Sequence, residues 1–302
     1  MAENTKIQWA DSTFNPWRGC EKVSPGCKFC YAARMAARNP AVLGRWGSEG
    51  TRVLAADTQW AEPLKWHRND EGHVHRRRVF CCSLADVFDS WPGQMTDSST
   101  RPLYVNDGTD EAINHPMFHL SNSGIPYSLD CARQRLWRLI RATLGIDWLL
   151  LTKHPEDIPR MMPHGEWPNV WLGTSVENQE YTWRMDALME AAEKIVCPVR
   201  FVSAEPLIGE LNIRGQLGAD SINWLIVGGE SGAIRDVRYL RLEWVLSLIA
   251  QCDCAKVPIF VKQLGRNPVG IHLEDLHGGD ELEWPGIMRR RDFPELDDDG
   301  LF

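Results

Sequence analysis

The chain has 302 residues, 43% hydrophobic and 25% charged, and nine cysteines are too few at this length for a disulfide-rich scaffold. Its 33 basic and 41 acidic residues give a net charge of −8, which excludes a protein coated in positive charge that binds nucleic acid non-specifically. There is no apolar stretch long enough to span a membrane and no basic start followed by an apolar run, so we expect a cytoplasmic protein with no membrane partner.

The first feature in chain order is a cysteine-rich segment, residues 15–38, which predicts a ligand loop that runs into a helix. Cys27 and Cys30 form C-x2-C, a spacing that lets two thiolates hold one metal centre, and Cys20 lies seven residues earlier across a Ser-Pro-Gly turn. A closed structural zinc site takes four ligands, whereas an iron–sulfur cluster held by three thiolates keeps one iron open. A zinc site completed by a histidine, or buried cysteines without metal, are the alternatives.

Six short, almost continuously apolar runs follow and predict buried parallel strands. They are residues 79–86, 147–154, 169–178, 200–207, 223–232 and 258–265. Three amphipathic stretches between them predict helices, at residues 128–145, 181–196 and 240–252. We expect the first helix to begin at an N-cap, Ser128, and to keep Leu144 on its apolar side.

Strands that alternate with helices indicate βαβ units and a parallel sheet. With an N-terminal segment, the six strands fit an α/β fold that forms a partial or complete (β/α) barrel, and a doubly wound open sheet is the alternative. We expect one barrel domain over residues 1–265, with an insertion at 89–127 of the length of a functional lid. Residues 266–302 are expected to form a polar extension that packs loosely.

Polar residues follow each predicted strand. Because ligands bind at the carboxyl ends of parallel strands, we expect these side chains to surround one pocket. The candidate cofactor-binding residues are Ser83, Asp86, Ser175, Glu177, Gly228, Gly229 and Glu230. Lys153 and Glu205, at two further strand ends, are the candidate catalytic residues; they would pair or move a proton near the substrate, and a purely structural salt bridge is the alternative.

Arginines are grouped in two places. Three consecutive arginines, Arg76–Arg78, precede the first of the six strands, and four recur at helical spacing within residues 133–141. Against the negative net charge, these residues are candidates for a face that follows the phosphates of a nucleic acid. An ordinary solvated face is the alternative.

The strings NPWRGCEKVSPGCKFCYAARMA, LTKHPE, VWLGTSVENQ, RFVSAEPLIG, VGGESG and FVKQLG lie within residues 7–265. They resemble the phage-associated three-Cys-motif family, which is named after phage gene products 37 and 68. The C-x6-C-x2-C loop, with Phe29 just before the last cysteine, also looks like the cluster loop of radical S-adenosylmethionine (SAM) enzymes. Those enzymes usually have C-x3-C-x2-C, so this chain departs from their pattern in the first gap.

The resemblance implies a role for each cysteine of the loop. Cys20, Cys27 and Cys30 would ligate a [4Fe–4S] cluster and leave one iron for SAM, and an external electron donor would drive cleavage of SAM to methionine and a 5′-deoxyadenosyl radical. Gly228–Glu230 looks like the Gly-Gly-Glu element that holds the SAM amino group in such enzymes, although there it follows an earlier strand. Ser83 and Asp86 follow a strand nearer to the cluster loop.

The sequence thus leads to the expectation of an iron–sulfur enzyme of the radical SAM type. The phage association, and a likeness to spore photoproduct lyases, indicate modification or repair of a nucleic acid or nucleotide substrate. A long loop that closes over an extruded base would suit such chemistry. The alternative is a zinc-stapled, non-catalytic phage binding or adaptor protein. We expect a monomer.

Overall fold

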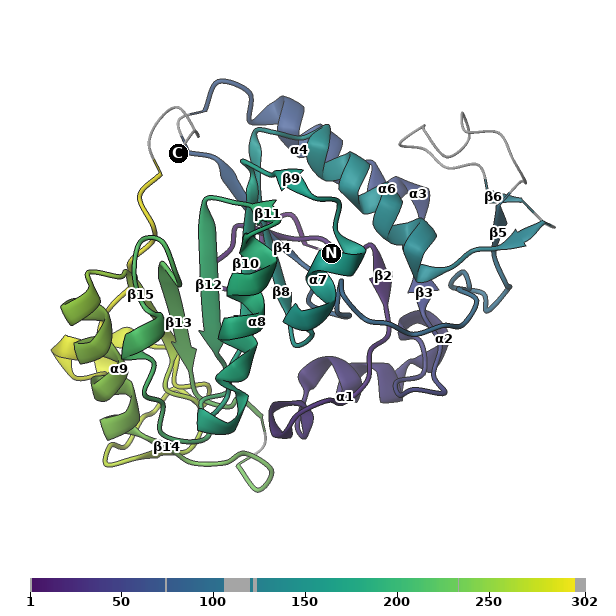
Figure 1. Ribbon diagram of the computed structural model, residues 1–302. Helices are drawn as coiled ribbons and strands as arrows, with labels where there is room; N and C mark the ends of the chain where they lie inside the picture. The colour runs from purple at the N-terminus through teal and green to yellow at the C-terminus, as the bar shows by residue number, and fades with distance from the viewer. Residues whose placement is uncertain (1, 74, 106–119, 122–123, 233, 297–302) are drawn as a thin grey trace.

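The computed structural model describes residues 2–73, 75–105, 120–121, 124–232 and 234–296 (Figure 1). Its centre is a seven-stranded sheet in which every neighbouring pair of strands is parallel. The strands, in spatial order, are β1 (Ser12–Thr13), β4 (Arg77–Cys81), β8 (Ile146–Thr152), β10 (Val170–Ser175), β12 (Val199–Ala204), β13 (Trp224–Gly228) and β15 (Ile259–Gln263). The last six confirm the six predicted strands, and β1 is the expected N-terminal addition.

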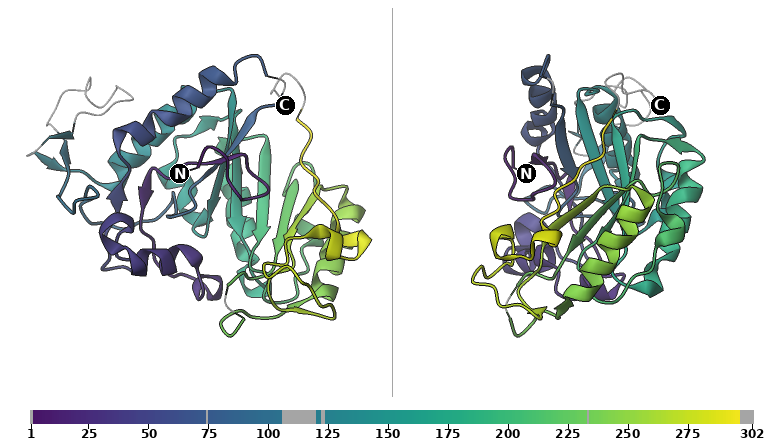
Figure 2. Two further views of the ribbon diagram at one scale, coloured as in Figure 1. Left: turned by 180° about the vertical axis from the view of Figure 1, so that it is seen from behind. Right: turned by 90° about the vertical axis from the view of Figure 1, so that its left-hand side faces the viewer.

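The order of the strands decides between the two predicted architectures. Each strand pairs with the next one along the chain, from β1 at one edge to β15 at the other. A doubly wound sheet would reverse its order at a switch point, so that alternative is wrong. Among the described residues no pairing joins the two edge strands, and the sheet curls without closing (Figure 2). The fold is a partial parallel (β/α) barrel.

Helices cover the convex face of the sheet, as Figure 1 shows for α8 and α9. The helices are α1 (Tyr31–Arg38), α2 (Pro40–Leu43), α3 (Asp57–Trp60), α4 (Glu62–Asn69), α6 (Leu129–Arg141), α7 (Ile158–Met161), α8 (Trp183–Ala192) and α9 (Leu242–Ala255). Short 3-10 turns include η1 (Pro25–Cys27), η2 (Pro155–Asp157) and η4 (Arg214–Gln216). No helix in the described part of the chain is both long and apolar enough to cross a membrane.

Helix α6 begins where the sequence predicts and ends earlier. The hydroxyl of Ser128 accepts a hydrogen bond from the backbone N–H of Cys131 at 3.4 Å, which confirms the N-cap. The hydroxyl of Thr143 donates to the carbonyl of Leu139 at 2.7 Å and occupies an acceptor at the end of the helix. Leu144 therefore lies beyond the helix and is 54% exposed, so its predicted place on the apolar side is wrong.

The sheet is buried on both faces, which explains why its strands read as continuous apolar runs. Alternate residues contribute to two layers. The outer layer packs under the helices, and the inner layer fills the concave side of the half-barrel with aromatic side chains. Trp171 and Trp224 meet edge to face there, with ring centroids 5.4 Å apart, and Phe293 packs against Trp224 at 5.5 Å.

The C-terminal extension is part of this packing, contrary to the expectation that it packs loosely. Trp284 and Met288 are buried in the outer core. Arg291 forms an antiparallel bridge with Phe260 of β15, and Phe293 lies under the guanidinium of Arg78. The apolar residues of this segment are isolated among acidic ones and show no period. The sequence pattern therefore did not predict an ordered segment that reaches residue 296.

The remaining short strands form small separate sheets. These are β2 (Trp17–Arg18) with β3 (Val53–Leu54), β9 (Gly165–Glu166) with β11 (Ile195–Val196), β14 (Leu240–Arg241) with β16 (Pro268–Val269), and β5 (Tyr104–Val105) with β6 (Leu120–Ser121) and β7 (Ile125–Pro126). The three-stranded sheet belongs to the insertion at 89–127. The lid predicted there falls largely on residues 106–119 and 122–123, which lie outside the described residues.

Candidate metal and cofactor site

A cavity of about 420 Å³ opens at the carboxyl ends of the strands, a size typical of small-molecule sites. The cysteine loop forms one side of it, and residues at or just after the carboxyl ends of β4, β8, β10, β12, β13 and β15 form the others. Ten of the twelve predicted site residues line this cavity: Cys20, Cys27, Cys30, Ser83, Asp86, Lys153, Ser175, Glu205, Gly229 and Glu230. Glu177 and Gly228 lie behind its wall. The carboxyl ends of parallel strands lie at one edge of the sheet, and the predicted polar residues are found at that edge.

The three cysteines of the loop are free thiols that face the same space. The loop leaves β2 after Arg18, turns through η1, which ends at Cys27, and enters α1 directly after Cys30. All three thiols are half-buried. Phe29, the aromatic residue between the last two positions, also lines the cavity. The loop therefore presents three ligands to one enclosed volume.

The spacing of the thiols distinguishes between metals. In the described part of the chain, the one group of three metal-ligating side chains whose ligand atoms all lie within 4.8 Å of one another is His154, Glu156 and Asp157. At least one pair of the three cysteine sulfurs is therefore more than 4.8 Å apart. Tetrahedral zinc, with Zn–S bonds of about 2.3 Å, holds its sulfurs about 3.8 Å apart. The three thiols as they stand are therefore not a preformed tetrahedral zinc site, and a cubane cluster, which places its irons between the thiolates, needs a wider set.

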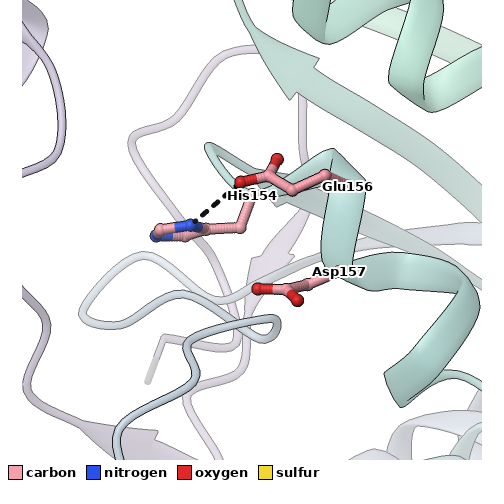
Figure 3. A group of neighbouring side chains, drawn as sticks. All are labelled: His154, Glu156 and Asp157. Atoms are coloured by element: carbon pink, nitrogen blue, oxygen red, sulfur yellow. Dashed lines mark ion pairs between the residues drawn. The ribbon is translucent and has the colours of Figure 1, made fainter.

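The His154 group lies beside the cavity and was not predicted from the sequence, although His154 and Glu156 are part of the string LTKHPE. Figure 3 shows the three side chains on one side of η2. His154 lines the cavity, and its Nδ1 lies 3.7 Å from a carboxylate oxygen of Glu156. Asp157 is already paired with Arg160 at 2.8 Å, and Glu156 faces solvent. We assign no metal to this group.

A buried carboxylate holds one side of the cysteine loop. Glu177 is fully buried, and its Oε1 accepts a hydrogen bond from the Ser24 hydroxyl at 2.5 Å. Arg184 of α8 donates to the other carboxylate oxygen at 3.0 Å, and the ammonium of Lys153 lies 3.3 Å from Oε1. Glu177 thus joins the loop, the outer helix layer and a lysine of the cavity wall.

Glycine is required in the loop where it passes this carboxylate. A Cβ at Gly26 would lie 2.7 Å from Cγ and 2.8 Å from Cδ of Glu177. Real Cβ contacts are not that short, and Glu177 cannot withdraw while it pairs with Arg184. The close approach explains why the turn before Cys27 contains a glycine.

Replacing Gly26 with alanine is therefore expected to push the loop off Glu177 and to lower metal loading at least several-fold. The measurement is the iron bound per chain after anaerobic reconstitution. Gly215→Ala is the matched control, because a Cβ there would have no heavy atom within 4 Å. Equal iron loading in the two variants would contradict the assigned contact.

A second ion pair holds the other side of the loop. Glu230 follows β13 and accepts hydrogen bonds from the backbone and guanidinium of Arg238, the shortest at 2.5 Å. Arg238 also donates to the carbonyl of Pro25 at 3.0 Å and lies over the ring of Phe29. The sequence prediction placed Glu230 against a cofactor; its described contacts are with the arginine that holds the loop. Arg238 itself belongs to no motif and was missed.

The candidate catalytic residues do not pair with each other. Lys153 pairs with Glu177, whereas Glu205 pairs with Lys262 at 2.8 Å and accepts a hydrogen bond from Ser203 at 3.2 Å. Both pairs reach the cavity through one member or both. Each is a structural ion pair and is also placed where it can meet a ligand.

Asp86 and the glycines of β13 have structural partners. Asp86 is buried and accepts hydrogen bonds from the Thr152 hydroxyl at 2.7 Å and the Lys153 backbone at 2.9 Å, which ties the end of β4 to that of β8. A Cβ at Gly228 would lie 2.7 Å from a Glu205 oxygen, and one at Gly229 would lie 2.6 Å from the carbonyl carbon of Leu264. The two glycines are accounted for by packing.

Burial shapes the chemistry of two thiols at the cavity. Desolvation, followed by the nearby carboxylates of Asp86 and Asp89, raises the pKa of Cys20 well above its ordinary value. Desolvation and Cys81 likewise raise the pKa of Cys82, which lines the same cavity. Without metal, Cys20 is therefore a neutral thiol, and it must release a proton when it becomes a ligand.

The comparisons with known proteins name a family. A family model described as a protein of unknown function, DUF5131, matches residues 4–100 and 118–284. The chain belongs to the DUF5131 family. No curated protein and no solved structure matches it. The DUF5131 match contains the cysteine loop, both ion pairs that hold it and all six strand ends of the cavity, and its gap lies inside the insertion at 89–127.

The arginines predicted to follow phosphates serve the DUF5131 fold instead. Arg77 pairs with Asp70 at 2.5 Å and Arg78 with Asp11 at 3.2 Å, both at the amino end of the sheet. Arg133 and Arg135 of α6 are 4% and 1% exposed. The predicted phosphate face is therefore wrong at Arg77, Arg78, Arg133 and Arg135, because ion pairs within the fold engage these side chains. Arg141, the last of the group on α6, is exposed, and there the prediction stays open.

Proposed function

We propose that this DUF5131 protein is an iron–sulfur enzyme of the radical SAM type that acts on a nucleic acid or nucleotide. One observation carries the proposal. Three free cysteines, on a loop held by two ion pairs, open into a cavity at the carboxyl ends of a partial parallel barrel. Such a site has the ligand set and the space for a cluster and a second molecule.

The residues present fit the group. Cys20, Cys27 and Cys30 would hold the [4Fe–4S] cluster and leave one iron for SAM. When bound, the cluster would supply the electron that cleaves SAM to methionine and a 5′-deoxyadenosyl radical. The protein's part is to hold the loop and to keep water away. Trp9 and Phe80 of the inner aromatic layer line the cavity and close its floor.

Polar residues of the cavity wall would orient what binds beside the cluster. Ser83 is fixed by Asn15, whose amide donates to its hydroxyl at 3.1 Å, and Ser175 is buried at the end of β10. Lys262 and Glu205 form a neutral pair at the ends of two strands, in which the lysine can donate and the carboxylate can accept a proton. These groups suit a substrate that needs a proton moved after a hydrogen atom is taken.

The test begins with protein purified and reconstituted without oxygen. We expect about four irons and four sulfides per chain, and formation of 5′-deoxyadenosine when dithionite and SAM are added. The Cys20→Ala variant serves as the control without a cluster. A colourless protein that binds one zinc and forms no 5′-deoxyadenosine would overturn the proposal and favour a zinc-stapled adaptor.

The substrate class has its own test. The reduced enzyme is incubated with SAM and with DNA, RNA or nucleotides deuterated in base and sugar. Deuterium in 5′-deoxyadenosine is expected with at least one of them. SAM cleavage without any transfer of deuterium would retain the enzyme class and exclude this substrate class.

A further inference from the structure

Basic residues are concentrated in two segments beside the cavity. Residues 22–48 contain five lysines and arginines and no acidic residue, and residues 234–241 contain three arginines and one aspartate. The whole chain has more acidic than basic residues, 41 against 33. The two segments are therefore locally basic although the chain as a whole is acidic.

The two segments lie against each other. Arg34 of α1 reaches Asp236 at 3.9 Å and the carbonyl of Ser231 at 3.5 Å, and Arg238 donates to Pro25. Figure 1 places α1, α2 and the chain before β14 along the lower edge of the sheet, where the cavity opens. They form one surface on both sides of the loop.

Six basic side chains of this surface are exposed, and we call them the basic rim: Lys22, Lys28, Arg38, Arg45, Arg235 and Arg241. Arg235 is 85% exposed and lies 3.7 Å from Asp236; for the other five, no ion pair occurs among the residues that the structure describes. Arg77, Arg78 and Arg133 are, by contrast, paired with carboxylates. The rim charges are available to an external anion.

Aromatic side chains accompany the rim. Tyr31 lines the cavity, is 47% exposed, and donates its hydroxyl to the carbonyl of Ser83 at 3.0 Å, so its ring stands at the mouth. Tyr239 is 48% exposed between two rim arginines, with Arg241 5.5 Å from its ring centroid. Exposed aromatic rings within a basic surface are the usual platform on which unpaired bases stack.

We propose that the basic rim binds the sugar–phosphate backbone of a single-stranded polynucleotide and delivers one of its bases to the cavity. The inference rests on the proposed function and narrows its substrate from any nucleotide to a strand. A free nucleotide needs only the cavity, whereas the rim extends from the cysteine loop past α1 to Arg45 and along the chain up to β14, and offers contacts to several phosphates. Four of its six residues are arginines, whose planar guanidinium matches phosphate geometry.

An acidic electron-carrier protein is the other partner that a basic surface suits. The strand is favoured because Lys22 of the rim lines the cavity and because the exposed ring of Tyr31, on α1 between rim residues, lines it too. A protein seated over the cavity mouth would close the route by which substrate enters. The two partners differ in what they require, so one set of variants separates them.

The experiment measures binding of fluorescein-labelled 20-residue oligonucleotides, as single-stranded DNA, single-stranded RNA and duplex, to the cluster-loaded protein over a range of salt. About six phosphate contacts would give a log–log salt slope near −4 for a single strand. Arg38→Glu with Arg45→Glu is expected to weaken single-strand binding at least tenfold and to reduce the slope by about 1.4. Iron content and circular dichroism verify that each variant is folded and loaded.

The matched control is Arg68→Glu with Lys194→Glu, two exposed residues in α4 and before β11, at the opposite edge of the sheet (Figure 1). The affinity of this control variant for single-stranded oligonucleotides should stay within twofold of that of the original protein. The proposal that the rim binds a single strand would be overturned if the two double variants lowered the affinity equally, or if the original protein showed no salt-dependent binding. It would also be overturned by rim variants that bind oligonucleotides normally and lose only SAM cleavage driven by reduced flavodoxin, since that result assigns the rim to an acidic electron donor.

Failure of the rim and failure of the proposed function give different results. If 5′-deoxyadenosine forms with dithionite while the rim variants bind oligonucleotides as tightly as the original protein, the proposed enzyme class holds and the single-stranded substrate is excluded. If the rim variants lose oligonucleotide binding but the original protein never cleaves SAM, the surface stands and the chemistry does not.

Discussion

Replacing Cys20, Cys27 or Cys30 with alanine is expected to reduce the iron bound per chain from about four atoms to well below one, with loss of the brown colour. Each of the three thiols lines the cavity on a loop that has no further cysteine. No other thiol of the loop can therefore take the place of a lost ligand. The measurement is iron and sulfide content, with the absorbance spectrum, after anaerobic reconstitution of each variant. A variant that still binds a full cluster would remove that cysteine from the ligand set.

Two other cysteines serve as controls. Cys254 is exposed at the end of α9, so Cys254→Ala should leave both iron content and stability unchanged. Cys82 is the sharper control because it lines the cavity near Cys20. Burial keeps Cys82 in its neutral form, and it follows a strand outside the loop, so we expect Cys82→Ala to retain the cluster. Loss of iron in that variant would indicate a four-thiolate site with no open iron, and SAM would then have no place to bind.

The fold could be predicted from the sequence because its signal is local. A strand buried on both faces appears in the sequence as a continuous apolar run, and six such runs predicted the last six strands of the central sheet. The periodicity did not decide how the strands are ordered, because a barrel and a doubly wound sheet repeat the same unit. The C-terminal segment was misjudged for a related reason. Trp284, Met288 and Phe293 are long-range contacts without a period.

The residues of the site could be predicted more completely than their partners. The rule about strand ends correctly placed seven residues at one cavity, and the cysteine spacing placed three more, since each prediction needs only the position of a residue along the chain. Which group pairs with which depends on distances between strands. The contacts of Glu177 with Ser24 and of Arg238 with Pro25 span 153 and 213 residues, and no motif reports them. The basic rim could not be predicted because its residues are scattered over two distant segments, whereas several of the clustered arginines form ion pairs within the fold.

Replacing Glu177 with glutamine is expected to lower the free energy of unfolding of the metal-free protein by about 3 kcal/mol, because Arg184 would remain buried without a countercharge. Both side chains of the pair are almost inaccessible, at 0% and 2% exposure. The measurement is urea-induced unfolding in the presence of a chelator. Glu62→Gln is the control: its pair with Lys65 is exposed, and such pairs contribute less than about 1 kcal/mol.

The same substitution should also weaken iron loading, since the Ser24 hydroxyl would lose its charged acceptor and the loop would loosen before Cys27. This joint effect separates positioning from ligation. A cysteine variant should lose iron while the metal-free protein keeps most of its stability, whereas Glu177→Gln should lose some of both. If Glu177→Gln lowers stability but binds iron as tightly as the original protein, the buried pair supports only the barrel, and the loop must be held by the Arg238 contact alone.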